Sequence, residues 1–163
     1  MKRTEPRKVT IYTDGACLGN PGPGGYGVVL LYQGRRKELS GGYRETTNNR
    51  MEMRAAIAGL KMLKESCRVT LYSDSAYLVK AMTEGWARKW RQNNWRRTRK
   101  EKALNPDLWE ELLRLCDRHQ VEFQWVKGHA RSAENARCDQ LAWEAAQQPD
   151  LPDDPGYHRK GKP

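Results

Sequence analysis

Two segments that lie far apart in the chain share one pattern of residue types, and this repetition constrains the fold more than any other feature. The segments are Val9-Thr-Ile-Tyr-Thr-Asp14-Gly-Ala and Val69-Thr-Leu-Tyr-Ser-Asp74-Ser-Ala. Both alternate apolar and polar residues with the period of a strand, and both place an aspartate where the alternation stops. If the two strands are parallel neighbours, their carboxyl ends meet at one edge of a sheet, where α/β proteins bind their ligands. We therefore expect an α/β fold with Asp14 and Asp74 side by side.

The other secondary-structure signals complete a mixed sheet. The predicted strands cover residues 9–14, 26–32, 37–43, 69–74 and 121–126, with a hairpin turn at residues 33–36. The predicted helices cover residues 51–64, 75–82, part of 86–102, 108–119 and 133–146. Between the first two strands, residues 15–25 form a glycine-rich loop that we do not expect to continue either strand. The sequence thus predicts an α/β fold with a mixed five-stranded sheet, three antiparallel strands and then parallel ones, flanked by helices.

The length of the chain, 163 residues, suits one domain with a substantial core. We expect this domain to cover residues 1–148, and residues 149–163, rich in proline and charge, to form a flexible tail. No apolar run approaches the roughly 18 residues of a membrane span. The basic start leads into a strand and not into the apolar core of a signal peptide. The sequence therefore predicts a cytoplasmic protein without membrane contact, monomeric and without an obligate protein partner.

The cysteines are scattered, without a Cys-x-x-Cys pair or a histidine at zinc spacing. They are Cys17, Cys67, Cys116 and Cys138. A disulfide scaffold is not expected in a chain of this length without a secretion signal. We predict reduced thiols that mostly pack in the interior.

A net charge of +10 and a pI near 9.6 favour a polyanionic partner, although many basic surfaces are simply solvated. The charge is concentrated in residues 86–102, which we call the basic handle. Its cations and tryptophans are Arg88, Lys89, Arg91, Arg96, Arg97, Arg99, Lys100 and Lys102, and Trp86, Trp90 and Trp95. Cations for phosphates with aromatic rings among them are typical of nucleic-acid binding. The alternative is a solvated helix, and the spacing of Trp86 and Trp90 predicts that these two side chains lie in the core.

Several acidic residues have the placement of metal ligands. Alone, Asp14 and Asp74 could be a turn residue and a helix cap. Side by side they would repel each other and raise one pKa, and a divalent cation removes that conflict. Glu52 shares the apolar stripe of its helix with Ala56, so its carboxylate needs a partner unless it belongs to a capping box. Asp139, beside the apolar line of the last helix, is a weaker fourth candidate. Oxygen ligands without thiolates favour Mg²⁺, with Mn²⁺ as a substitute, over zinc.

Five stretches of the sequence carry a resemblance to a known family. They are Tyr12-Thr-Asp-Gly-Ala-Cys-Leu-Gly-Asn-Pro-Gly22, Thr46-Thr-Asn-Asn-Arg-Met-Glu52, Tyr72-Ser-Asp-Ser75, Asn105-Pro-Asp-Leu-Trp109, and Val126-Lys-Gly-His-Ala130 followed by Glu134-Asn-Ala-Arg-Cys-Asp139. In this order and spacing they resemble ribonuclease HI, the bacterial type 1 ribonuclease H. The likeness runs from about residue 8 to residue 157. It implies the ribonuclease H-like fold.

The resemblance implies an endonuclease that hydrolyses the RNA strand of RNA–DNA hybrids without sequence specificity, leaving 5′-phosphate and 3′-hydroxyl ends. The metal-binding residues of the family fall on Asp14, Glu52, Asp74 and Asp139. In the two-metal scheme one ion activates the attacking water and the other stabilises the leaving 3′ oxygen. The family's assisting histidine falls on His129, where an imidazole suits a proton carrier or a product-release gate. Without the resemblance, His129 would be interpreted as an exposed loop residue.

The resemblance also implies the contacts that recognise the substrate. The 2′-hydroxyl distinguishes RNA from DNA, and relatives contact the minor groove around it. The matching minor-groove positions are Cys17, Asn20, Asn48 and Asn49, and the positions that resemble a pocket for a DNA-strand phosphate are Thr47 and Asn105. Asn135 and the basic handle complete the predicted substrate-binding set. Asparagine and threonine are also ordinary turn and cap residues. His119 matches no motif and is predicted at the surface.

Three positions depart from the family pattern, and two rival functions remain. Ser132 stands where some members have a second histidine, Ala76 where some have glutamine, and Glu45 where some have a phosphate-binding arginine. One rival is a nuclease of the same superfamily that acts on DNA, against which the asparagine-rich helix and the basic handle argue. The other is a catalytically silent module that binds hybrids, which is disfavoured because all the carboxylates are present.

Overall fold

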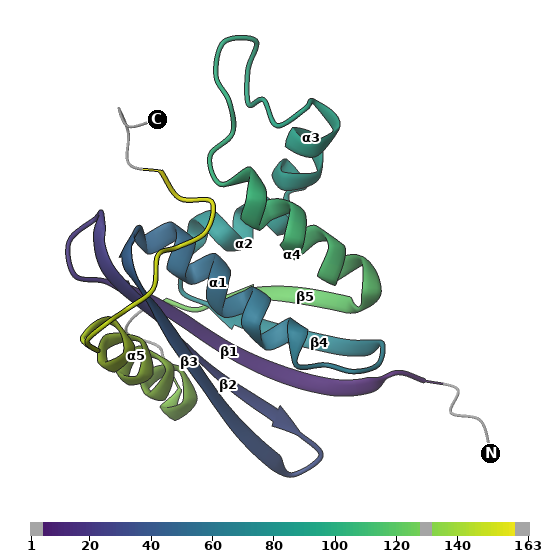
Figure 1. Cartoon of the computed structure of the whole chain (residues 1–163). Helices are drawn as coiled ribbons and strands as arrows, with labels where there is room; N and C mark the ends of the chain where they lie inside the picture. Colours follow the sequence, from purple (N-terminus) through teal and green to yellow (C-terminus); the bar gives the residue numbers. More distant parts are fainter. Residues whose placement is uncertain (1–4, 128–131, 159–163) are drawn as a thin grey trace.

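The computed structural model describes residues 5–127 and 132–158, and its centre is a mixed five-stranded sheet with the order β3-β2-β1-β4-β5 (Figure 1). The strands are β1 (Arg7–Cys17), β2 (Gly22–Tyr32), β3 (Arg35–Thr46), β4 (Cys67–Ser73) and β5 (Gln120–Trp125). The first three pair antiparallel, whereas β1 pairs with β4, and β4 with β5, in parallel. The predicted mixed α/β sheet is therefore confirmed.

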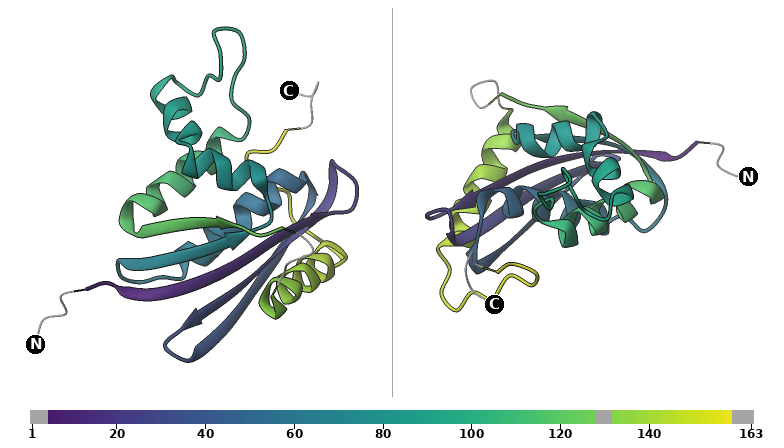
Figure 2. Two further views of the ribbon diagram at one scale, coloured as in Figure 1. Left: turned by 180° about the vertical axis from the view of Figure 1, so that it is seen from behind. Right: turned by 90° about the horizontal axis from the view of Figure 1, so that it is seen from above.

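The helices cover both faces of this sheet. They are α1 (Asn48–Lys61), α2 (Ala76–Thr83), α3 (Trp86–Gln92), α4 (Pro106–Arg118) and α5 (Ala133–Ala146). Helix α5 packs on β1, β2 and β3, while α1 packs on the opposite face with α4 against it (Figures 1 and 2). The bounds of α5 coincide with those predicted from the sequence. No helix within residues 5–127 and 132–158 is long and apolar enough to cross a membrane.

The glycine-rich stretch between the first two strands is mostly strand, which corrects the predicted loop at residues 15–25. The connection between β1 and β2 is only residues 18–21, because β1 reaches Cys17 and β2 begins at Gly22. The glycines serve packing. A Cβ at Gly25 would lie 2.2 Å from the Ala142 carbonyl oxygen, and one at Gly27 would lie 2.3 Å from that of Cys138. Helix α5 can therefore rest its backbone directly on β2.

The segment that follows α5 also differs from its prediction, because residues 149–158 do not form a loose tail. The carboxylate of Asp154 is buried and accepts hydrogen bonds from the Thr46 hydroxyl at 2.6 Å and from Nε of Arg50 at 2.7 Å. The Arg44 amide donates to the Pro152 carbonyl at 2.7 Å. Proline and charge suggested disorder, but the partners that fix this segment lie about a hundred residues earlier in the chain. Local composition cannot reveal them.

Candidate metal centre and nucleic-acid interface

The register of the two matching strands brings their aspartates together. In the parallel pair of β1 and β4, Tyr12 lies opposite Tyr72, and the two rings stack with centroids 5.0 Å apart. Asp14 and Asp74 each come two residues later, at the same edge of the sheet. This is the side-by-side placement that the repeated sequence predicted. The stacked tyrosines stabilise the pairing of the two strands just before the carboxylates.

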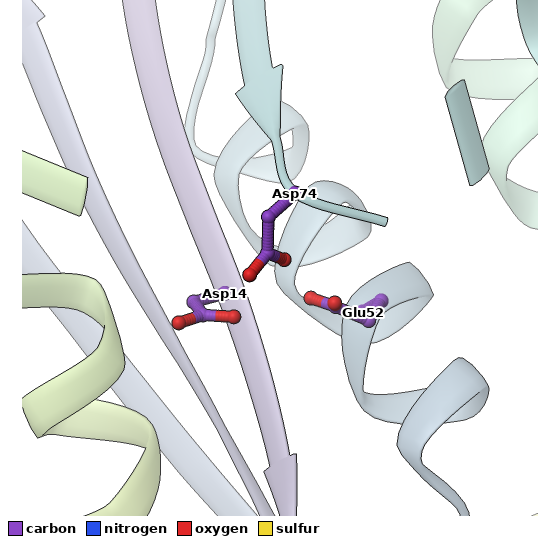
Figure 3. Close-up of side chains that lie close together, drawn as sticks. All are labelled: Asp14, Glu52 and Asp74. Carbon is purple, nitrogen blue, oxygen red and sulfur yellow. The ribbon is translucent and has the colours of Figure 1, made fainter. Parts of the chain in front are cut away.

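Helix α1 supplies a third carboxylate. Thr47 caps this helix, since its hydroxyl accepts from the Arg50 amide at 3.3 Å, and Glu52 follows on the side that faces the sheet. Figure 3 shows Asp14, Glu52 and Asp74 converging from three different elements. One oxygen atom of each lies within 4.8 Å of those of the other two. Glu52 is 4% exposed, so its predicted position on the buried stripe of α1 is confirmed.

The electrostatics of this group fit a bound cation. Burial, and then the charges of Asp74 and Asp139, raise the pKa of Asp14 to about 8. Burial, and then the charges of Asp74 and Asp14, raise the pKa of Glu52 well above its usual value. Glu52 Oε1 and Asp74 Oδ1 are buried without a hydrogen-bond partner among the described residues. Unpaired oxygens of this kind match the donor set that Mg²⁺ prefers, and a divalent cation would offset the repulsion.

The fourth predicted carboxylate approaches from the other face of the sheet. Asp139 lies on α5 and is half-buried. It raises the pKa of Asp14 through its charge and through a hydrogen bond. The group whose oxygens meet within 4.8 Å does not include it. The structure therefore brings three of the four carboxylates into one cluster and places the fourth beside Asp14.

Gly15 sets the distance between β1 and α1 at this cluster, and a methyl group there should disturb both stability and cleavage. A Cβ would lie 2.6 Å from the Glu52 amide nitrogen and 2.7 Å from the Met51 carbonyl carbon, so α1 would have to move. We expect Gly15→Ala to cost about 1–3 kcal/mol of unfolding free energy, as overpacking does, and to lower kcat for hybrid cleavage at least tenfold. Urea unfolding and initial rates measure the two effects.

The matched control for Gly15→Ala is Gly34→Ala, in the turn between β2 and β3. A Cβ at Gly34 meets nothing within 4 Å, although its φ of +77° makes the substitution unfavourable. We expect a loss of about 1–2 kcal/mol from that backbone conformation and an unchanged kcat. Wild-type cleavage by Gly15→Ala would show that the spacing of α1 does not matter.

The loop of the predicted assisting histidine is outside the described residues, which end at residue 127 and resume at residue 132.

Ser132, one of the departures from the family pattern, has a structural role at the start of α5. Ser132 caps α5 by accepting from the Asn135 amide at 3.3 Å, and Asn135 Oδ1 accepts from the Ser132 hydroxyl at 3.0 Å. Asn135 is 5% exposed. The side-chain oxygen of Asn135 is therefore engaged in a capping box with Ser132.

The predicted minor-groove residues gather at the end of β1 and the start of α1. Oδ1 of Asn20 accepts from the Asn48 amide at 3.0 Å, which ties the β1–β2 connection to the first turn of α1. Asn20 and Asn49 are exposed, and Cys17 is half-buried. The structure thus brings Cys17 and Asn20 together with the start of α1, in the same helix as Glu52.

The two residues predicted to bind a phosphate are joined by a third that the sequence did not single out. Arg50 donates from its amide to Thr47 Oγ1 and from Nη1 to Asn105 Oδ1, the latter at 3.1 Å. Its side chain is only 1% exposed. A buried arginine requires carboxylate partners, here Asp107 and Asp154. The signal in the sequence was an arginine inside the Thr-Asn-Asn-Arg-Met-Glu motif, without an indication of its partners.

The basic handle projects from the body of the molecule (Figure 1) as α3 and an irregular loop with a bridge between Arg96 and Lys102. Trp90 is half-buried and packs edge-on against Trp109, with centroids 5.9 Å apart. Trp86 is 38% exposed, so the prediction that it lies in the core is wrong. It lines a pocket of about 430 Å³ together with Lys89 and others.

The cations of the handle are mainly exposed. The residues Arg88, Lys89, Arg96, Arg97, Arg99, Lys100 and Lys102 are exposed, whereas Arg91 and Trp95 are half-buried. Some of them have ion-pair partners, such as Arg88 with Asp117 at 2.9 Å and Arg97 with Glu101 at 3.0 Å. Exposed pairs of this kind contribute little to stability and can exchange for phosphates. The handle therefore presents positive charge beside an aromatic surface.

The prediction that His119 lies at the surface is wrong. His119 is 8% exposed, and its Nδ1 accepts from the Cys67 amide at 3.0 Å, so it is not a surface residue. Burial lowers its pKa. The cysteines fit their prediction better, because Cys67, Cys116 and Cys138 are buried, Cys17 is half-buried, and none of these four residues is in a disulfide.

The comparisons with known proteins agree on one family. The sequence profile of the family described as RNase H matches residues 6–147. A ribonuclease H of Syntrophus aciditrophicus is 68% identical over 154 residues, covering 94% of this chain and 89% of that protein. The solved structure of LC9-RNase H1, a type 1 RNase H with the type 2 active-site motif, has a TM-score of 0.77 at 34% identity, covering 89% of this chain and 74% of that one. LC11-RNase H1, solved in complex with an RNA/DNA hybrid, has a TM-score of 0.66 at 27% identity, covering 85% and 96%.

Proposed function

The chain belongs to the ribonuclease H family and is a hydrolase acting on nucleic acid, and from this premise we propose that it is an endonuclease that cuts the RNA strand of RNA–DNA hybrids without sequence specificity, leaving 5′-phosphate and 3′-hydroxyl ends. The observation that carries the proposal is the cluster of Asp14, Glu52 and Asp74, in which two carboxylate oxygens are buried without a hydrogen-bond partner among the described residues. LC11-RNase H1, of the same fold, was solved with such a hybrid. The proposal includes a monomer that works in the cytoplasm.

In the proposed reaction, Asp14, Glu52, Asp74 and Asp139 hold the divalent ions, with Mg²⁺ as the natural choice. When bound, a pair of such ions supplies the activated attacking water and the stabilisation of the leaving 3′ oxygen. The chain provides rigid positions for the carboxylates. The Gly15 amide donates to Asp14 Oδ1 at 2.9 Å, and each ligand rests on a strand end or a capped helix. His129 is proposed to carry a proton to or from the reacting groups.

Recognition of the hybrid is proposed to divide between two surfaces. The surface of Cys17, Asn20, Asn48 and Asn49 would contact 2′-hydroxyls and base edges in the minor groove, where short amide side chains can both donate and accept. The basic handle, with Trp86 on its exposed side, would hold the backbone of the DNA strand. The bond between Asn20 and the Asn48 amide supports this division, because it fixes the minor-groove surface next to the carboxylates.

The handle should act through charge, and salt dependence tests this. We expect the triple variant with glutamine at Arg96, Arg97 and Arg99 to raise KM for a hybrid roughly tenfold at about 0.1 M salt, with little change in kcat. Each lost phosphate contact removes about 0.7–0.9 from the slope of log affinity against log salt, so the slope should fall by about two. Initial rates over a salt series measure both quantities.

The control variant carries glutamine at Arg35, Lys37 and Lys64. These exposed cations lie near the turn between β2 and β3, at the opposite end of the sheet from the handle (Figure 1). The net charge changes equally, so the control should retain the wild-type slope. Equal slopes in all three proteins would exclude phosphate binding by the handle.

The decisive experiment for the proposed function uses one body-labelled RNA in three forms: single strand, RNA duplex and hybrid with DNA. Each is incubated with Mg²⁺ and with EDTA, and the ends of the products are analysed. We expect cleavage of the hybrid alone, only with metal, and ligatable 5′-phosphates. A labelled DNA duplex of the same sequence is added as a fourth substrate, and its cleavage would favour the rival DNA nuclease. Tight binding of the hybrid without any cleavage would favour the silent binding module.

A further inference from the structure

Arg50 occupies an unusual position, because its charged group is buried where three distant segments meet. The guanidinium lies between α1, the start of α4 and residues 152–157, which we call the C-terminal segment. Its recorded partners are Asp107 Oδ2 at 2.7 Å, Asp154 Oδ2 at 2.7 Å, Asn105 Oδ1 at 3.1 Å and the Pro155 carbonyl at 2.9 Å. The ring of Tyr157 lies over it, with the centroid 5.9 Å away. The orientation of the guanidinium is therefore determined from several sides.

Arg50 engages an acceptor atom on each of the two residues proposed to bind a DNA-strand phosphate. Its amide donates to Thr47 Oγ1 and its Nη1 donates to Asn105 Oδ1. A hydroxyl or a carboxamide whose oxygen already accepts such a bond has its O–H or N–H groups left for another partner. Phosphate oxygens only accept hydrogen bonds. The backbone amide of residue 50 thus sets Thr47, and the guanidinium of Arg50 sets Asn105, in the polarity that an anion requires.

The C-terminal segment fixes Arg50 in turn. The Asp154 side chain is fully buried and accepts from Arg50, from Arg54 at 2.5 Å and from the hydroxyl of Thr46. Thr46 immediately precedes Thr47, so one carboxylate contacts both the arginine and the chain that leads into the helix cap. Removal of this carboxylate would leave the guanidinium with fewer partners and let it turn away from Asn105.

We propose that Arg50, held by Asp154 of the C-terminal segment, is a positioning residue that orients Thr47 and Asn105 to bind a phosphate of the DNA strand. The proposal rests on the proposed function and extends it, since it gives the segment after α5 a role in substrate affinity. A positioning role and a purely structural role of Arg50 predict different results. Loosening the segment should weaken the binding of one particular phosphate and leave the carboxylate cluster unchanged.

Two adjacent aspartates provide a matched test. Asp154→Asn introduces an amide that faces the donors of Arg50, whereas Asp153→Asn makes the same chemical change one residue away, in a side chain that is 79% exposed and paired with Arg44. We expect Asp154→Asn to weaken hybrid binding about tenfold in EDTA and to raise KM by a similar factor in Mg²⁺, with kcat changed less than twofold. A hydrogen bond to a charged group has this magnitude. Asp153→Asn should match the wild type in all three quantities.

A scan of the DNA strand with single methylphosphonates identifies the phosphate involved. In the wild type, one neutral linkage should weaken binding about tenfold. In Asp154→Asn the same linkage should cost less than twofold, because the contact is already lost and the two changes do not add. The proposal is overturned if every linkage costs Asp154→Asn as much as it costs the wild type, or if kcat falls as much as KM rises.

Arg54→Met provides the answer if Asp154→Asn does not fold. The Arg54 side chain is 15% exposed and donates to Asp154 and to the Pro155 carbonyl. Its loss removes two contacts of the C-terminal segment and leaves Asp154 itself unchanged. We expect about threefold weaker binding and a reduced effect of the same methylphosphonate; a wild-type profile would contradict the proposal. Because binding is measured in EDTA, these outcomes do not depend on cleavage. A failure of the proposed nuclease activity would appear separately, as a wild type that binds hybrid without cutting it.

Discussion

Asp14→Asn is expected to abolish hybrid cleavage in Mg²⁺ and to leave hybrid binding nearly intact. Removal of one preorganised charge-stabilising group costs roughly 10²–10³ in kcat in well-studied enzymes. Asp14 should cost at least a thousandfold, because it interacts with both the Asp74 and the Asp139 carboxylates and so connects the two sides of the proposed ligand set. Binding should persist because Asp14 is 5% exposed and the proposed substrate contacts lie elsewhere. Single-turnover cleavage and fluorescence anisotropy of a labelled hybrid measure the two properties.

The control for this prediction is Asp153→Asn, which changes an exposed carboxylate paired with Arg44. It should cleave at the wild-type rate. Turnover by Asp14→Asn within tenfold of the wild type would remove Asp14 from the reaction. A loss of binding equal to the loss of turnover would instead indicate that the substitution disturbs the fold.

The metal-free protein should lose stability as the pH rises, and Asp14→Asn should largely remove this loss. The pKa of Asp14 is raised from 3.8 to about 8, so the folded state holds this proton more tightly than the unfolded state. The resulting stabilisation is fully present below the unfolded pKa and disappears as the pH rises through the folded pKa. In EDTA the variant should therefore exceed the wild type in stability, and the difference should widen by about 2–3 kcal/mol between pH 5.5 and 8.5.

Thermal unfolding at these two pH values tests the prediction. A widening of about 2–3 kcal/mol corresponds to roughly 4–12 °C in Tm for a chain of this size. Mg²⁺ should raise the Tm of the wild type at pH 8.5 and change that of the variant much less, because a ligand stabilises the state that binds it. A constant difference between the two proteins across this pH range would mean that Asp14 does not carry the shifted titration. Glu52→Gln should show the same direction, since burial raises its pKa as well.

The sequence predicted those features that depend on local periodicity. The alternation in β1 and β4 identified the matched aspartates, and the apolar stripe of α1 identified Glu52 as a buried acid. The bounds of α5 agree with those predicted from the sequence, 133–146. In each case the relevant information lies within about ten residues of the side chain concerned.

Most of the features that the sequence did not predict depend on contacts between distant segments. The glycines of β2 were interpreted as loop because their partner, the backbone of α5, lies far along the chain. The C-terminal segment was interpreted as disordered because Arg50 and Arg54 are not its neighbours in the sequence. Trp86 was placed in the core by its spacing from Trp90, although the short helix α3 leaves one ring at the surface. Periodicity in the sequence identifies a helix or a strand, but it does not identify the segments that the helix or strand contacts in the fold.

The docking of α5 on the glycines of β2 has a consequence for when the protein can act. The proposed ligands begin with residue 14 and end with residue 139, so the set is completed only when the last helix settles onto the sheet. A nascent or partly denatured chain without α5 in place would therefore lack a complete set of the proposed ligands. The proposed hydrolysis of a hybrid would thus report complete folding more stringently than helical content does, because it requires ligands from both ends of the chain.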